Sequence, residues 1–398
     1  MLTNRVFGLA SLALAAAGVA FGADPIFYGY LNAGAIDLNA DYSKYNHIAV
    51  IFAIIKEDGT FAYNDDAKIP ELANKAHESG GKVLAALGGY AGSNNFSSIV
   101  RDENLRNQFA QHISDYIKEK NLDGVDLDWV YVGVDLTGCA VTDPANDSKN
   151  YLTFLQGLRK KLDDDFGPRN KLITLGVRVL PFEGPDGPVD DVSEFAKVVD
   201  FANLFQFDLN GPWGNTTGPL APLNFQEGKG EQVSYTSAID AWINAKWPAN
   251  QLTASIPMYG LAFQAAEDML ADPGNQYQAT TQDIPVGDSD DGPETGPCGG
   301  KESASGQWKW KNLIGQGVMS NPTTPNEPWS RQVDEQTKTP WLFNKDNKIF
   351  ISMDDPDSIK AKVDFAKEKG LAGMNAYTID MDTGGQELTN AIVNDWNS

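Results

Sequence analysis

The sequence is poor in the residues that bind metals and in those that form disulfide-rich scaffolds. Its 398 residues include only three histidines, His47, His77 and His112, and two cysteines, Cys139 and Cys298. These residues lie far apart and show no metal-ligand spacing, so we expect no zinc site, no other metal and no cofactor. The two cysteines can form one bridge or remain buried thiols, and the sequence leaves both alternatives open.

Positive charge is also scarce. The chain has 31 Lys and Arg residues against 54 Asp and Glu residues, which gives a formal net charge of −23. This charge repels phosphate backbones and anionic lipids, so we expect neither nucleic acid nor a membrane surface as a partner. With 41% hydrophobic and 21% charged residues, the chain can bury a core, which excludes a disordered or fibrous protein.

The amino-terminal segment has the pattern of a secretory signal. Arg5 precedes an apolar run over residues 6–20, and small residues follow up to Ala23. The run of about 15 apolar residues is shorter than the roughly 20 that a membrane-spanning helix requires. We therefore predict a signal peptide over residues 1–22, a mature domain over residues 23–398 and an extracellular location.

Three Asn-X-Ser/Thr sites fit a secretory route, at Asn95, Asn146 and Asn215. Such sites accept N-linked glycans in secreted proteins but also arise by chance. The sequence thus predicts a glycoprotein without deciding which site is used.

Strand-like apolar runs alternate with helix-period segments, which predicts an α/β protein with a parallel sheet covered by helices. Helices are expected over residues 103–120 and 357–369. Residues 262–350 break the alternation, so we expect a small inserted subdomain between strand seven and its helix. The eight predicted strands, which together favour a closed (β/α)8 TIM barrel, are Ile26–Tyr30, Ile48–Ile54, Lys82–Leu87, Gly124–Leu127, Leu172–Val177, Phe201–Phe207, Gln251–Pro257 and Gly373–Tyr377.

The segment Asp123–Tyr131 carries the strongest chemical signal. Asp126 and Asp128 alternate with apolar residues, which places both carboxylates on one face of a strand end. In a barrel, active sites lie at the carboxyl ends of the strands. Two acids confined there cost several kcal/mol unless one is protonated or hydrogen-bonded. A solvated turn explains Asp123 alone, so we interpret this segment as a functional site.

This segment resembles the signature D-G-x-D-x-D-W-E of glycoside hydrolase family 18, the chitinases and their non-hydrolytic relatives. The resemblance runs from strand one to strand eight and implies an eight-stranded α/β barrel, often with a small α+β insertion after strand seven. Four further segments resemble motifs of that family: Lys82–Tyr90 in strand three, Phe205–Asp208 in strand six, Ile256–Gly260 in strand seven and Gly373–Tyr377 in strand eight.

The resemblance implies a substrate-assisted mechanism, in which the N-acetyl group of the sugar attacks its own anomeric carbon. Asp128 would orient the acetamide, and Asp126 would be its inner partner. The general acid would stand at position 130, where this chain has Val130, which has no proton to give. Other departures from the family pattern are Phe207 for Tyr, Ala86 for Ser, Val132 for Pro and Tyr377 for Trp.

Sugar binding needs stacking rings and hydrogen-bonding groups rather than a proton donor. We therefore predict a secreted, catalytically inactive chitinase-like monomer that binds chitin and chitooligosaccharides, and that could sequester chitin fragments. The predicted sugar-binding residues are Phe52, Tyr90, Asp128, Trp129, Tyr131, Phe207, Asp208, Trp213, Tyr259 and Tyr377.

Two alternatives remain open at this point. The first is a low-activity chitinase or endo-N-acetylglucosaminidase in which Asp135, Glu183 or Asp208 donates the proton. The second is a protein-binding barrel whose sugar cleft is closed.

Overall fold

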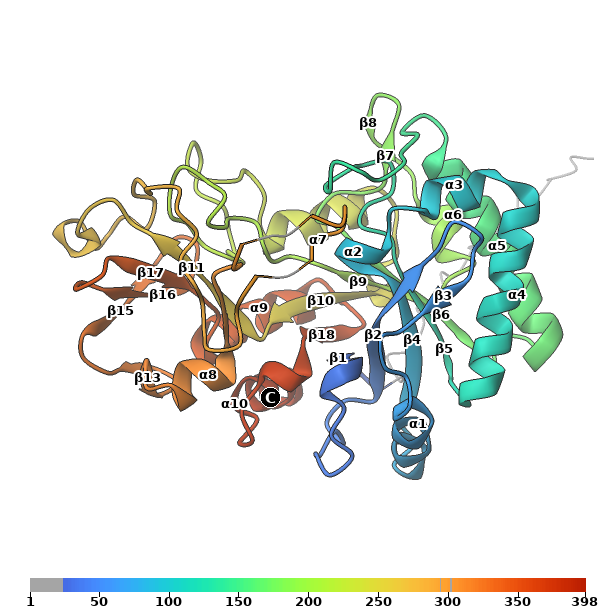
Figure 1. Cartoon of the computed structure of the whole chain (residues 1–398), viewed down its shortest axis with the longest axis horizontal. Coiled ribbons are helices and arrows are strands. Elements are labelled where there is room, and N and C mark those ends of the chain that lie inside the picture. Colours follow the sequence, from blue (N-terminus) through green and yellow to red (C-terminus); the bar gives the residue numbers. More distant parts are fainter. Residues whose placement is uncertain (1–23, 294, 301–302) are drawn as a thin grey trace, which may run out of the picture.

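The computed structural model describes residues 24–293, 295–300 and 303–398, so the predicted signal peptide lies outside the described residues. Eight parallel strands close into a barrel, because the first strand pairs with both the last and the second (Figure 1). This confirms the predicted fold class. The barrel strands are β1 (Ile26–Asn32), β2 (His47–Ile55), β4 (Lys82–Gly88), β5 (Gly124–Asp128), β6 (Leu172–Val177), β9 (Phe201–Leu204), β10 (Leu252–Pro257) and β18 (Gly373–Tyr377).

Helices surround the barrel, and their ends follow the local sequence. Helix α4 spans Glu103–Lys120, as predicted, because the Asp102 side chain caps its first turn and Asn121 ends it with a left-handed backbone. Helix α9 begins at Pro356, where Asp355 caps the helix. The remaining helices are α1 (Ile69–Glu78), α2 (Gly89–Gly92), α3 (Phe96–Arg101), α5 (Asp147–Phe166), α6 (Ser193–Ala196), α7 (Tyr235–Asn244), α8 (Trp310–Gly315) and α10 (Glu387–Asn397), while α9 ends at Glu368.

Strand β9 is shorter than predicted. The Phe205 amide still donates to the Val177 carbonyl at 2.8 Å, but the chain then leaves the sheet. Asp208 adopts a left-handed backbone with φ of 56°, which turns the chain away from the strand direction. The last residues of the predicted strand, 205–207, therefore line the mouth of the barrel instead of extending the sheet.

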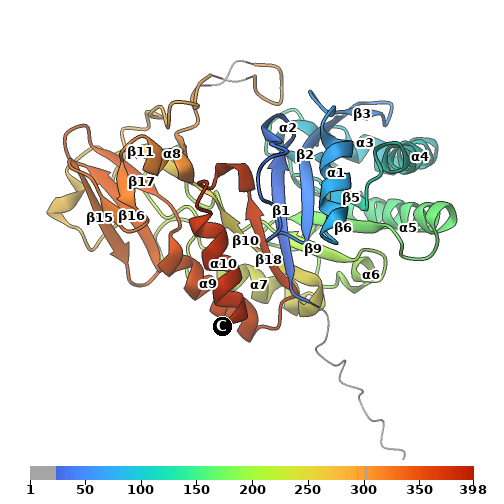
Figure 2. The ribbon, with the colours of Figure 1, turned by 90° about the horizontal axis from the view of Figure 1, so that it is seen from below.

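An antiparallel sheet of five strands, in the order β12-β11-β17-β16-β15, lies beside the barrel (Figures 1 and 2). The predicted boundaries of the insertion, residues 262 and 350, fall within the first and last of its strands in chain order. The strands of this sheet are β11 (Tyr259–Gln264), β12 (Gln307–Lys309), β15 (Trp329–Asp334), β16 (Thr339–Asn344) and β17 (Ile349–Ser352). Two short antiparallel pairs lie outside it, β7 (Glu183–Gly184) with β8 (Gly187–Pro188) and β13 (Met319–Asn321) with β14 (Thr324–Pro325). The short strand β3 (Phe61–Ala62) pairs with β2.

A disulfide joins the insertion to the barrel. Cys139, in the loop after β5, is bonded to Cys298, with their Cα atoms 5.9 Å apart. Nearby, the Asn94 side chain donates to the Pro297 carbonyl at 3.1 Å. The structure therefore decides between the two alternatives that the sequence leaves open for the cysteines.

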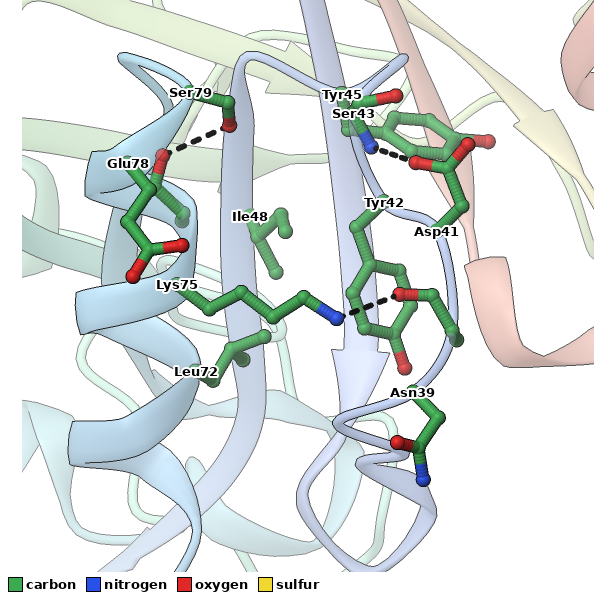
Figure 3. A pocket seen from close by; sticks show the side chains of 12 residues that line it. Asn39, Asp41, Tyr42, Ser43, Tyr45, Ile48, Leu72, Lys75, Glu78 and Ser79 are labelled. Atoms are coloured by element: carbon green, nitrogen blue, oxygen red, sulfur yellow. Dashed lines mark hydrogen bonds between the residues drawn. The ribbon is translucent and has the colours of Figure 1, made fainter.

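A cavity of about 360 Å³ lies at the amino-terminal end of the barrel, between α1 and the connection from β1 to β2 (Figure 3). The Lys75 ammonium reaches across it and donates to the carbonyls of Leu38 and Ala40. Backbone carbonyls of the chain therefore already accept hydrogen bonds from the ammonium group that crosses this cavity. Active sites of such barrels lie at the opposite end, where the strands reach their carboxyl termini.

Candidate functional site

The centre of the barrel holds a buried pair of acids, Asp126 and Asp128, both 0% exposed. The Thr174 hydroxyl donates to Asp126, and the Asn203 amide lies 3.5 Å from the same oxygen. In contrast, neither oxygen of Asp128 accepts a well-formed hydrogen bond from a described residue. The pair therefore combines one carboxyl anchored through a single oxygen with one whose partners are the Asp126 carboxyl and the Gly176 amide.

Burial governs the protonation of this pair. Burial raises the pKa of Asp126, and it raises the pKa of Asp128 well above its usual value with a further contribution from the charge of Asp126. Two carboxylates in such a confined space do not both ionise near neutral pH. The pair therefore holds a proton.

Glycines make room for these acids. A Cβ atom at Gly176, on the neighbouring strand β6, would lie 2.0 Å from an Asp128 carboxylate oxygen. At the end of β4, Gly88 and Gly89 have positive φ angles, and a Cβ on Gly89 would collide with the Phe52 ring at 2.5 Å. The sequence Gly-Gly after this strand is thus required by the close approach of its neighbours.

A second acid, Asp208, lies just beyond the end of β9. The Tyr259 hydroxyl donates to its Oδ1 at 2.7 Å. Asp208 is exposed at the barrel mouth, yet the protein atoms around its carboxyl desolvate it and raise the pKa of Asp208 to about 6, although the Tyr259 hydrogen bond opposes this shift. Burial, together with the charges of both Asp128 and Asp208, raises the pKa of Tyr131 and Tyr377, which shows that both acids act on the same two phenols.

Aromatic rings surround these acids. The Tyr377 ring lies 5.0 Å from Phe207, which lies 6.2 Å from Tyr259, measured between ring centroids. Phe205 and Tyr30 lie below them, 5.7 and 5.4 Å from Tyr377. The structure thus brings together the predicted residues of the fourth, sixth, seventh and eighth barrel strands around an aromatic floor.

Val130 follows Asp128 by two residues and is half-buried at the mouth of the barrel. Its amide donates to the Ser93 hydroxyl at 3.0 Å, and that hydroxyl lies 2.9 Å from the Asp128 carbonyl. The backbone at this position is therefore held in place, but the side chain has no group that can donate a proton.

The structure places Trp129 outside this site. Its side chain is 3% exposed and stacks on Phe96 with ring centroids 5.1 Å apart, and Tyr151 meets it edge-on. It thus packs between the barrel and its helices, where it cannot contact a sugar. The alternation that points Asp126 and Asp128 inward points the intervening Leu127 and the following Trp129 outward, so the spacing itself carried the signal that the prediction overlooked.

The three other predicted rings have different surroundings. Trp213 is 64% exposed in the loop after β9, and Tyr90 is 48% exposed in α2. Phe52 is half-buried against Gly89. Tyr90 and Trp213 follow the carboxyl ends of β4 and β9, and Phe52 lies in the carboxyl-terminal half of β2.

Two of the three alternative proton donors are committed elsewhere. Glu183 accepts a hydrogen bond from the Arg178 guanidinium. Asp135 is exposed; desolvation pushes its pKa up, but hydrogen bonds from Gly138 and Thr137 lower the pKa of Asp135 below its usual value. Asp208 is thus the alternative with a raised pKa.

Sequence reasoning missed a polar network that supports the acid pair inside the barrel. Asn203 donates to the Tyr30 hydroxyl at 2.9 Å and accepts from Thr253 at 2.6 Å, while Asn375 donates to Thr253 at 2.9 Å. Each lies at an inward position of its strand, and buried polar groups need such partners. Polar residues at alternate positions of otherwise apolar strands were the available signal.

Within the described residues, no group of three or more His, Cys, Asp or Glu side chains is placed to hold a metal ion. The described part of the chain also contains no helix with the length and apolar character needed to cross a bilayer.

Comparison with known proteins agrees with this geometry. Residues 26–382 match the family model of the glycosyl hydrolases family 18. The chain is 32% identical over 348 residues to a chitinase-like effector from Moniliophthora roreri, covering 84% of this chain and 83% of that protein. It is 30% identical over 354 residues to a chitinase-like effector from Moniliophthora perniciosa, covering 86% and 79%.

Among solved structures, a chitinase from Rhizomucor miehei matches with a TM-score of 0.86 and 28% sequence identity, covering 93% of this chain and 99% of that chain. The closed barrel with acids at the carboxyl ends of its strands is that of a chitinase-type fold. The chain belongs to glycosyl hydrolases family 18.

Proposed function

We propose that this protein binds chitin and chitooligosaccharides at the barrel mouth without hydrolysing them. One observation carries the proposal: the position two residues after Asp128 is Val130, while the acids and rings around it remain in place. The sugar-binding residues of the proposal are Phe52, Tyr90, Asp128, Tyr131, Phe207, Asp208, Trp213, Tyr259 and Tyr377.

Titration of the wild-type protein with chitohexaose, followed by chromatography of the mixture, tests this function. We expect saturable heat and an unchanged oligomer, because binding needs rings and acceptors whereas cleavage needs a proton donor. Turnover of about 1 per second or faster would contradict the loss of catalysis. Absence of any binding would instead favour a protein-binding barrel.

A low-activity hydrolase is the second candidate, because the pKa of Asp208 is raised to about 6. A carboxyl with such a pKa can donate a proton at mildly acidic pH. If prolonged incubation gives slow product release, the variant Asp208→Asn distinguishes the two functions. Loss of that release would assign Asp208 as the acid.

Trp213→Ala should weaken chitohexaose binding by roughly 1–3 kcal/mol, since the exposed indole offers a large stacking surface. The thermal midpoint should stay unchanged because the side chain lies outside the core. Val333→Ala, at an exposed position of β15 in the insertion sheet, is the matched control and should leave the affinity unchanged. Equal affinities of the Trp213→Ala variant and the wild type would remove this ring from the cleft.

We also propose that the protein acts outside the cell as a monomer. The disulfide between Cys139 and Cys298 supports this location, because such bonds persist mainly in oxidising compartments. Among the three predicted glycosylation sites, Asn146 and Asn215 are exposed, whereas Asn95 is partly buried. Glycans are therefore proposed at the first two.

A further inference from the structure

One segment of the insertion reaches the barrel and is fixed at both its base and its far end. At the base, the Asp291 carboxylate accepts hydrogen bonds from the amides of Gly287 and Gly306 at 2.7 and 2.9 Å, which draws the two ends of the segment together between β11 and β12. At the far end, Cys298 is bonded to Cys139 in the loop after β5. Figure 2 shows this segment, in orange, extending from the insertion beside α8 to the end of the barrel where α2 lies.

The far end, residues 295–300, is called the tip, and it has little noncovalent support. The Asn94 side chain donates to the Pro297 carbonyl at 3.1 Å. A Cβ atom added at Gly299 or Gly300 would meet no atom within 4 Å, so these residues stand in open space. The disulfide is therefore the main attachment of the tip to the barrel.

The disulfide is accessible to dissolved thiols. Cys139 and Cys298 are both exposed residues, and neither belongs to the buried core. Thiol–disulfide exchange requires a thiolate to reach one of the two sulfur atoms, and exposed disulfides are the labile ones. Breaking this bridge would also leave the contacts of the core intact.

Attachment of the tip is connected to the sugar site through Asn94. The Asn94 side chain also accepts a hydrogen bond from the Thr137 hydroxyl at 3.3 Å, and its backbone carbonyl accepts one from the Val141 amide at 3.2 Å. The hydroxyl of the preceding residue, Ser93, donates to the Asp128 carbonyl at 2.9 Å. Adjoining hydrogen bonds thus connect the tip, the loop after β5 and the strand that carries the acids.

We propose that the disulfide between Cys139 and Cys298 is a reducible clasp, which holds the loop after β5 in its binding conformation and whose reduction weakens the binding of chitooligosaccharides. The reductant class is a small dithiol. This inference rests on the proposed function, because the loop after β5 borders the proposed sugar site.

Reduction of the clasp proceeds by two exchange steps. One thiolate of the reductant attacks a sulfur of the bridge and forms a mixed disulfide, while the other cysteine leaves as a thiolate and is protonated. The second thiolate of the reductant then attacks its own sulfur in the mixed disulfide and releases the remaining cysteine. Two electrons pass to the bridge, so the protein gains two thiols and the reductant becomes a cyclic disulfide.

Release of the tip should lower the affinity for sugar rather than raise it. In the oxidised protein, the loop after β5 is already held in place when the oligomer arrives. In the reduced protein, the oligomer must order this loop, and ordering costs free energy that would otherwise contribute to affinity. We expect the reduced protein to bind chitohexaose about fivefold more weakly.

Calorimetric titration of the oxidised and the reduced protein with chitohexaose tests the inference. Excess dithiothreitol is added without denaturant, and titration of free thiols should then find both cysteines of the chain. The protein should stay folded by circular dichroism, because both cysteines lie in exposed loops. The double variant Cys139→Ser with Cys298→Ser is the matched control: it should bind as the reduced protein does and should not respond to dithiothreitol.

The possible results distinguish the inference from the proposed function. Weaker binding by the folded, reduced protein and by the double variant supports the inference. Equal affinities in the two redox states, or a bridge that resists reduction without denaturant, overturn the inference alone. Unfolding of the reduced protein would show a stabilising bridge rather than a clasp and would also overturn it. Absence of binding in both redox states overturns the proposed function together with the inference.

Discussion

Hydrolysis of chitohexaose is expected to appear in the variant Val130→Glu, from an undetectable rate in the wild type. The backbone at this position is fixed by Ser93, so the new carboxyl would project into the mouth beside Asp128. Repulsion by the acid pair and partial burial would raise its pKa toward the range of a general acid. Such an acid contributes a factor of about 10² to 10⁴ in rate.

The single variant should nevertheless remain a slow enzyme. Phe207 has no hydroxyl with which to hold the acetamide carbonyl, a role that the family pattern gives to tyrosine at this position. We expect Val130→Glu combined with Phe207→Tyr to exceed the sum of the single variants, because both groups act on one transition state.

Val130→Gln is the matched control, since glutamine has the same shape as glutamate but does not act as a general acid. Product release is measured by chromatography after identical purifications, which also reveals contaminating chitinase. Activity in the Gln variant would show that the new carboxyl is not the proton donor. Full chitinase activity from Val130→Glu alone would show that Phe207 is incidental.

Replacing Lys362 by Met should lower the free energy of unfolding by about 3–5 kcal/mol. Lys362 on α9 and Asp354 before it form an ion pair in which both side chains are 1% exposed. Burial lowers the pKa of Lys362, and the charge of Asp354 opposes this shift. Removing the lysine leaves a buried carboxylate without its cation, at the point where the insertion rejoins the barrel.

Lys360→Met provides the control on the same helix, because Lys360 is 55% exposed and pairs with an exposed Asp364. Surface pairs of this kind contribute about 0–1 kcal/mol. Urea unfolding followed by fluorescence measures both variants. Similar midpoints for the two would show that the buried pair does not stabilise the fold.

The sequence alone determined the barrel and the chemistry of its central strand. Strand runs and helix periods are local properties, so the eight strands and the helix over residues 103–120 could be placed without tertiary information. The absence of a proton donor at Val130 is also a property of the sequence, because no folding can give valine an acidic proton. Asp126 and Asp128 could be assigned to one face from their spacing alone.

The tertiary structure decided which side chains meet. Trp129 was predicted to contact sugar although strand alternation already pointed it outward, and only the tertiary structure shows that Phe96 and Tyr151 enclose it there. The disulfide joins residues separated by 159 positions, a distance over which local patterns carry no information. The raised pKa of Asp208 likewise depends on atoms from several distant segments. Burial and electrostatic fields arise from the packing of the whole chain, so only the structure revealed how far the pKa values of the central acids are raised.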